Sequence, residues 1–151
     1  TDKVVYILRV AKYFGLWFVF IWMFTGAIVG LEYIEGYKIA TTEYYGLRNM
    51  GLVLVIIPIF LSSILYPVIV LPLSWLIGMI RWVRASLILY ALLYAVMWAG
   101  AGAFLFYESY EVRFIQEYEL YVSTAIILFG VVGLVYAWIE WRLLFRPVTT
   151  V

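Results

Sequence analysis

The chain has 151 residues, of which 68% are hydrophobic and only 13% are charged. Soluble domains are about 45–50% apolar and roughly 25% charged, so we predict a single integral membrane domain over residues 1–151. The net charge of +1, without a large basic patch, argues against nucleic acid as a partner. Because Cys and His are both absent, thiol chemistry, His-ligated haem and the usual zinc sites are excluded, and we expect no cofactor and no catalytic residue.

Charged residues divide the chain into four long apolar runs. Residues 13–31, 85–107 and 120–139 each match the roughly 20 helical residues that cross a hydrocarbon core about 30 Å thick. Stretches such as 52–61 are apolar on every side, which excludes the strict alternation of a closed β-barrel. We therefore predict an all-α integral membrane protein with four transmembrane helices.

The second run, residues 49–80, is too long for one simple crossing and too short for two with a turn. It contains Pro58, Pro67 and Pro72, and each proline removes a backbone donor and clashes with the preceding turn. We expect a kinked crossing over about 46–65, a break at Tyr66-Pro67, and an interfacial segment over about 67–84. The alternative is one long tilted helix that runs through Pro72.

The sequence also predicts a tandem repeat at an offset of 76 positions. Residues 22–45 and 98–121 share eight identities in 24 ungapped positions, where composition alone would give about two. Trp22 matches Trp98, and Gly26 matches Gly102. The repeat predicts two helical hairpins, about 5–66 and about 85–146, in a parallel arrangement with facing Gly-Ala sites. The alternative is that similar hairpins match through shared composition.

Basic residues are distributed unequally among the connections, which predicts the orientation. Seven lie at the termini and in the central connection: Lys3, Arg9, Lys12, Arg81, Arg84, Arg142 and Arg146. The other two connections hold Lys38, Arg48 and Arg113 together with seven of the nine acidic residues. We therefore expect a multi-pass protein of the cell membrane with both termini cytoplasmic. The residues expected at the inner interface, in contact with lipid, are Trp75, Arg81, Trp82, Arg84, Trp138, Trp141 and Arg142.

Small residues recur at helical spacing and predict close helix packing. They are Gly26, Gly30, Ala91, Ala95, Ala99, Ala103, Gly130 and Gly133. These residues are expected either to pack within one bundle or to form a seam with another subunit or another copy of the chain.

The outer connections carry the most unusual cluster of ionisable residues. Glu32, Glu35, Glu108 and Glu111 occupy repeat-related positions and are candidates for an outer site that binds a hard cation. The alternative is a solvated acidic surface. On the opposite side we expect Glu140 to form interfacial pairs with Arg.

These features favour a non-catalytic accessory or scaffold subunit of a larger membrane complex. The expected partners are the bilayer and other membrane-protein subunits. The alternative is a small oligomeric channel or solute carrier in which the acidic outer connections form a vestibule.

Overall fold

The computed structural model describes residues 2–36 and 52–146 and is all-α there, with no strand. Its elements are α1 (Asp2–Ile34), α3 (Val53–Leu65), the π-helical turn η1 (Tyr66–Val70), α4 (Leu71–Met79), α5 (Arg81–Ala85), α6 (Leu87–Ser109), α7 (Val112–Glu117) and α8 (Val122–Leu144). The stretches long and apolar enough to cross a membrane are α1, the continuous helix Val53–Met79, α6 and α8. This confirms the predicted all-α architecture and four apolar helices. Lys38, Glu43, Arg48 and the expected helix start near residue 46 lie outside the described residues.

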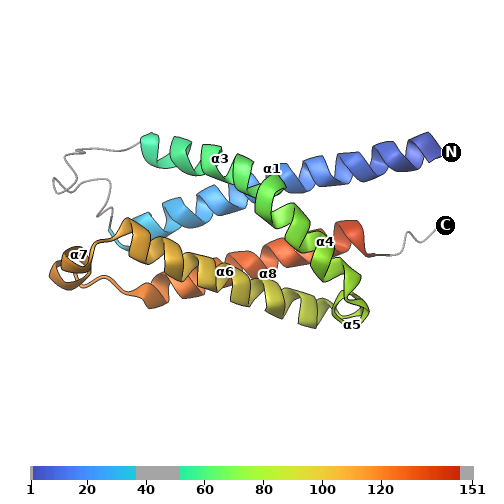
Figure 1. Cartoon of the computed structure of the whole chain (residues 1–151). Helices are drawn as coiled ribbons and strands as arrows, with labels where there is room; N and C mark the ends of the chain where they lie inside the picture. The colour runs from blue at the N-terminus through green and yellow to red at the C-terminus, as the bar shows by residue number, and fades with distance from the viewer. Residues whose placement is uncertain (1, 37–51, 147–151) are drawn as a thin grey trace.

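The first turns of α1 and the last turns of α8 lie at the same end of the helix bundle as α5, and α7 lies at the opposite end (Figure 1). We call these the α5 end and the α7 end. Helices α6 and α8 run antiparallel and share the largest interface, while α1 packs against both α8 and α3. α6 begins at an N-cap, because the Ser86 hydroxyl accepts a hydrogen bond from the backbone N–H of Leu89 (3.4 Å).

The expected break at Tyr66-Pro67 is wrong, because the chain stays helical from Val53 to Met79. Between α3 and α4 the helix widens into the π-helical turn η1, and its direction changes there (Figure 1). A wider turn accommodates a residue that cannot donate an N–H, so the helix bends without ending. The long helix running through Pro72, which was the alternative, is therefore the structure observed.

A tryptophan on α1 contacts the backbone at this bend. Pro67 has no N–H to offer to the Ser63 carbonyl four residues earlier. The indole N–H of Trp17 donates to that carbonyl at 3.0 Å. Ser62 and Ser63, which follow Pro58 in α3, donate to the carbonyls of Ile59 and Phe60. The hydrogen bond from Trp17 of α1 therefore stabilises the bend from a neighbouring helix.

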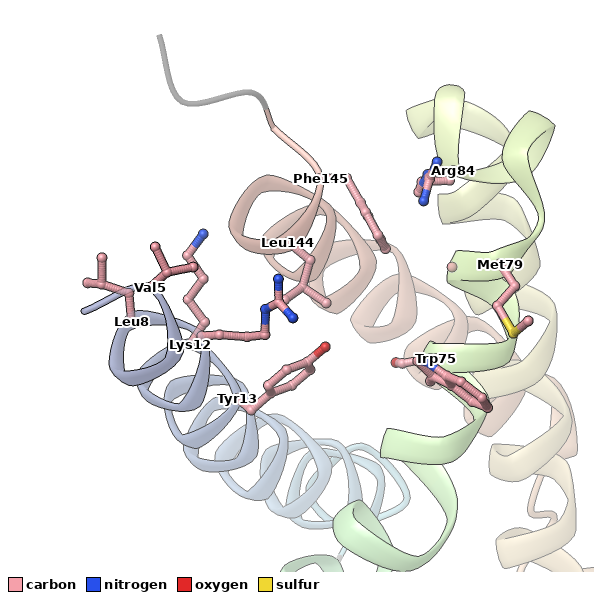
Figure 2. A pocket seen from close by; sticks show the side chains of 12 residues that line it. Val5, Leu8, Lys12, Tyr13, Trp75, Met79, Arg84, Leu144 and Phe145 are labelled. Atoms are coloured by element: carbon pink, nitrogen blue, oxygen red, sulfur yellow. The ribbon is translucent and has the colours of Figure 1, made fainter. Parts of the chain in front are cut away.

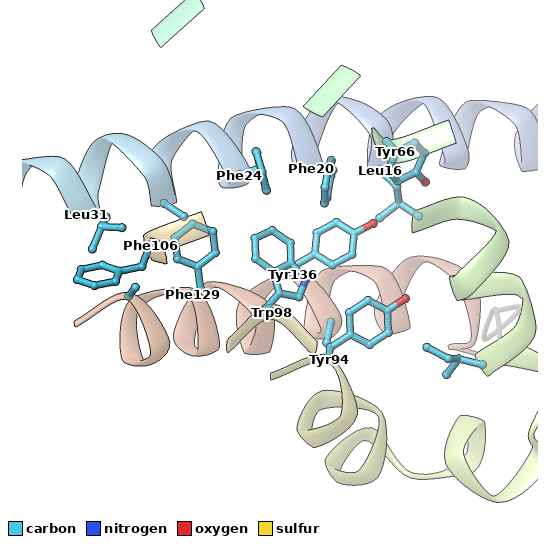
Figure 3. Packing of buried hydrophobic residues seen from close by; sticks show 14 of the residues in the cluster. Leu16, Phe20, Phe24, Leu31, Tyr66, Tyr94, Trp98, Phe106, Phe129 and Tyr136 are labelled. Atoms are coloured by element: carbon cyan, nitrogen blue, oxygen red, sulfur yellow. The ribbon is translucent and has the colours of Figure 1, made fainter. Parts of the chain in front are cut away.

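Aromatic rings from all four apolar helices meet around Phe20 of α1. Its ring centroid lies 5.6 Å from Trp98 of α6, 5.8 Å from Tyr136 of α8 and 5.7 Å from Tyr66 of η1. Figure 3 shows these rings converging between the helices. In a bilayer, lipid tails are as apolar as the side chains, so tight van der Waals and edge-to-face contacts, rather than the hydrophobic effect, hold helices together.

The α6–α8 interface uses two glycines in a reciprocal way. Trp98 of α6 covers Gly133 of α8, and Phe129 of α8 covers Gly102 of α6. A Cβ added at Gly133 would lie 2.6 Å from the Trp98 Cβ, and one added at Gly102 would lie 2.7 Å from the Phe129 Cβ. On each helix the aromatic residue precedes the glycine by four positions, so the aromatic ring and the glycine lie on the same face of the helix.

The predicted small-residue positions divide into inward and outward sets. A Cβ added at Gly130 would lie 3.8 Å from the Ala99 Cβ and from the Ala95 carbonyl oxygen, so this part of the alanine stripe packs on α8 within the chain. Ala91 also packs against the core, and Ala103 is half-buried. At Gly30 an added Cβ would make ordinary contact with Leu128 (3.5 Å). Gly26 faces open space, with no atom within 4 Å of such a Cβ.

Residues matched by the offset of 76 lie in different surroundings. Trp22 is 55% exposed whereas Trp98 is 7% exposed, and Gly26 is open whereas Gly102 is tightly covered. The predicted face-to-face placement of the two Gly-Ala sites is therefore wrong. Gly102 packs on Phe129 and Ala125 of α8.

Candidate functional site

Near the α5 end, α4, α6 and α8 bring five polar side chains together inside the bundle. Tyr90 and Tyr94 lie one turn apart on α6, Tyr136 and Glu140 lie one turn apart on α8, and Ser74 comes from α4. All five are buried, and Glu140 is only 1% exposed. We call these five residues the Glu140 cluster.

One carboxylate oxygen of Glu140 is the common acceptor of the cluster. Its Oε1 accepts hydrogen bonds from the hydroxyls of Tyr90 (2.9 Å) and Tyr94 (3.0 Å), and from the Ser74 hydroxyl. The Ser74 and Tyr94 hydroxyls are also within hydrogen-bonding distance of each other (2.5 Å). The carboxylate therefore joins α4, α6 and α8 through hydroxyl groups alone.

Such an arrangement suits a buried carboxylate, which must be hydrogen-bonded to remain inside a protein. Hydroxyl groups donating to an ionised acceptor form stronger hydrogen bonds than neutral pairs do. Oε2 of Glu140 and the Tyr136 hydroxyl have no hydrogen-bond partner among the described residues. The cluster therefore joins three helices through Oε1 of Glu140.

The sequence-based expectation for Glu140 was wrong. We expected this residue to lie at the interface and pair with Arg, but its partners are the hydroxyls of Ser74, Tyr90 and Tyr94. The available signal was the spacing of Tyr90 with Tyr94 and of Tyr136 with Glu140, because residues four apart share a helix face. That spacing predicts a polar face on each helix, but it does not show that the two faces meet.

An open pocket of about 830 Å³ adjoins the Glu140 cluster at the α5 end. Ser74 belongs to both, since it lines the pocket and donates to Glu140. Figure 2 shows Lys12 and Tyr13 of α1 on one side of the pocket and Trp75 and Met79 of α4 on the other. We call this space the α5-end pocket.

The residues predicted at the inner interface have three different placements. Trp75, Arg81, Trp82 and Arg84 are exposed, and of these Trp75 and Arg84 line the α5-end pocket. Arg142 lies over the half-exposed Trp138 ring, with its guanidinium carbon 5.0 Å from the ring centroid. Trp141 is half-buried, and its indole N–H donates to the Arg84 carbonyl (3.0 Å), so it fastens α5 to α8.

The four candidate outer carboxylates differ in how deeply they are buried. Glu32 is buried and accepts a hydrogen bond from the Tyr110 hydroxyl (2.6 Å), whereas Glu108 and Glu111 are exposed and Glu35 is half-buried. Within residues 2–36 and 52–146, no three Asp or Glu side chains are grouped so that they could hold a metal ion. Burial and then the hydrogen bond to Glu32 raise the pKa of Tyr110, so its hydroxyl remains a donor.

Replacing Tyr110 with Phe is expected to lower stability by about 1–3 kcal/mol, because Glu32 loses a donor at a buried position. Thermal unfolding in detergent, followed by loss of the monodisperse protein, measures the effect. Tyr107→Phe is the matched control, since Tyr107 is 61% exposed one turn before Tyr110. Equal melting temperatures for the two variants would contradict a stabilising role for the Glu32–Tyr110 bond.

Comparison of the sequence with protein-family models and with curated proteins gives no match, and comparison of the structure with solved structures gives none.

Proposed function

We propose that the chain is a non-catalytic accessory or scaffold subunit of a larger membrane complex. The observation that carries this proposal is the N-terminal part of α1, which is largely apolar yet exposed. Every side chain from Asp2 to Val10 is exposed. Val4, Val5, Tyr6, Ile7 and Leu8 are each between 57% and 70% exposed.

The length of α1 explains why this segment needs a covering surface. Its 33 residues extend about 50 Å, whereas a hydrocarbon core is about 30 Å thick. In Figure 1 the first turns of α1 extend past the end of α8. A contiguous apolar surface outside the hydrocarbon is typical of a protein–protein or membrane-surface contact.

The same helix carries a further unpartnered face along its apolar run. Gly15, Phe18, Trp22 and Gly26 follow one another at helical spacing and are all exposed. An added Cβ at Gly15 or Gly26 would meet no atom within 4 Å. Since an exposed glycine weakens a helix and glycine concentrates where membrane helices touch, this face supports contact with a helix of another subunit.

The proposal includes a topology of two helical hairpins with both termini on the cytoplasmic side of the cell membrane. The placement of the first turns of α1 and the last turns of α8 at the α5 end supports termini on one side (Figure 1). Arg9, Lys12, Arg81, Arg84 and Arg142 also lie at or near that end, and basic residues favour the cytoplasmic side.

The second candidate function is a small oligomeric channel or carrier. Two observations favour it. Glu140 is an ionisable residue buried among the apolar helices, as expected in ion and proton pathways. At the α7 end Glu108, Glu111, Glu117 and Glu119 are exposed and could attract cations to an outer vestibule.

Site-specific photo-crosslinking distinguishes these functions. A photo-reactive residue at Ile7 (63% exposed) is compared with one at Ile88 (72% exposed), which lies on α6 near the same end. For an accessory subunit we expect Ile7, but not Ile88, to give a discrete product with a different membrane protein in native membranes.

The other outcomes count against the accessory role. Products formed only between two copies of this chain would favour the channel or carrier. Attachment only to lipid, or the same products from both positions, would show that the N-terminal part of α1 has no dedicated protein partner.

A further inference from the structure

We infer that the α5-end pocket is a binding site for an anionic phospholipid, with the headgroup held by Arg9, Lys12 and Arg84 and an acyl chain lying along α4. This inference concerns a lipid ligand and does not depend on the accessory role proposed above. It rests on the charges of the lining residues, the apolar walls and the position of the pocket relative to the apolar runs.

The charges that line the pocket are all positive. Arg9 and Lys12 come from α1 and Arg84 comes from α5, and among residues 2–36 and 52–146 no acidic side chain lines the pocket with them. Among the residues that the structure describes, none of these three cations forms an ion pair. Three cations that share a concave surface without a counter-charge are complementary to an anion.

Glu140 does not cancel this charge at the pocket wall. Its Oε1 is covered by the hydroxyls of Ser74, Tyr90 and Tyr94, and the Glu140 side chain is 1% exposed. Ser74 is the member of the cluster that reaches the pocket. The inner wall is therefore a neutral hydroxyl side chain, and the basic residues dominate the field in the pocket.

The rest of the pocket lining is apolar and suits hydrocarbon. Trp75 and Met79 of α4 are 64% and 61% exposed, and they lie opposite Tyr13 of α1 (Figure 2). Leu144 and Phe145 line the pocket at the end of α8. Phosphate alone would leave these walls uncovered, whereas a phospholipid supplies both an anion and an acyl chain.

The pocket also lies at the depth where a phospholipid headgroup is found. Arg9 and Lys12 immediately precede the apolar run 13–31, and Arg84 immediately precedes the apolar run 85–107. Basic residues at such boundaries lie at the headgroup level. Basic pockets between membrane helices are suited to anionic lipid headgroups, and a pocket of about 830 Å³ is within the usual size of ligand sites.

The test measures binding of fluorescent phosphatidylglycerol to the purified full chain in neutral detergent, by fluorescence anisotropy. Fluorescent phosphatidylcholine is the zwitterionic comparison. The triple variant Arg9→Gln, Lys12→Gln, Arg84→Gln removes the pocket charges. The matched control Arg81→Gln, Arg142→Gln, Arg146→Gln removes three charges from the same end, outside the pocket lining. Because Arg84 accepts the Trp141 hydrogen bond through its backbone carbonyl, its side chain can be replaced without removing that bond.

We expect the pocket variant to bind phosphatidylglycerol on the order of 100-fold more weakly, since each of the three basic residues contributes roughly fivefold. The control variant should keep most of the affinity, and phosphatidylcholine should bind weakly to every variant. Met79→Trp fills part of the pocket without changing its charge and should also weaken binding. Soluble glycerol phosphate should not displace the lipid, because it lacks acyl chains.

Three results would overturn the inference. Equal losses in the two triple variants would show that general surface charge attracts the lipid. Displacement by glycerol phosphate would assign the site to a soluble phosphate compound. Unchanged binding in the pocket variant, with its elution profile and melting temperature retained, would place the lipid elsewhere.

Discussion

Replacing Glu140 with Ala is expected to destabilise the protein by about 3 kcal/mol, because three buried hydroxyls lose their common acceptor. For a chain of this size the melting temperature should fall by roughly 6–12 °C. The loss is not the sum of three hydrogen bonds, since Ser74 with Tyr94 (2.5 Å) and Tyr90 with Tyr94 (3.3 Å) can still pair. Thermal unfolding in detergent, followed by retention of the monodisperse species, measures it.

Two further variants separate the hydrogen bonds from the charge. Glu140→Gln keeps an acceptor oxygen and most of the side-chain volume, so we expect a loss of only about 1 kcal/mol. Glu117→Ala removes an exposed carboxylate on α7 and should change stability by less than about 0.5 kcal/mol. If Glu140→Ala melts at the same temperature as Glu117→Ala, the Glu140 cluster does not hold α4, α6 and α8 together.

The second large effect is expected at the reciprocal glycines of α6 and α8. Gly133→Ala would place a Cβ 2.6 Å from the Trp98 Cβ. Gly102→Ala would place one 2.7 Å from the Phe129 Cβ and 2.8 Å from the Ala125 carbonyl oxygen. The positions of these atoms are set by the backbone, so rotation of a side chain cannot relieve the overlap and the helices must move apart. Each substitution should cost about 1–3 kcal/mol.

Gly100→Ala is the matched control on the same helix, because a Cβ there would meet no atom within 4 Å. It should leave stability unchanged or raise it by up to about 1 kcal/mol through the higher helix propensity of alanine. Melting temperatures of the three variants in one detergent provide the comparison. If Gly102→Ala and Gly133→Ala match Gly100→Ala, the helices tolerate separation and the reciprocal contact is not a main source of stability.

The predicted class of protein depends on local properties of the chain. An apolar run of about 20 residues must form a helix in lipid, because its backbone groups have no other partners there. This argument located α1, α6 and α8 without any knowledge of their neighbours. It was less successful for Val53–Met79, where three prolines predicted a break. The helix instead continues through η1, and the Trp17 indole contacts the backbone at the bend.

The site residues were harder to predict, because burial depends on how each helix is rotated. Glu32 and Glu108 have the same place in the proposed repeat, but one is buried against Tyr110 and the other is exposed. Trp22 and Trp98 differ in the same way. A one-dimensional pattern assigns equal roles to such pairs, whereas helix rotation gives them different neighbours.

Hydropathy along the chain is sufficient to predict four long apolar helices, and the charge pattern places Arg9, Lys12 and Arg84 on one side of the membrane, because both properties act over short stretches. Which helix faces meet depends on how the helices are assembled. The tertiary structure brought Ser74, Tyr90, Tyr94 and Glu140 together from positions up to 66 residues apart, and it placed Trp98 and Phe129 over glycines on the opposite helix. In a bilayer these outcomes depend on close packing and buried hydrogen bonds, whose geometry exists only once the helices are assembled.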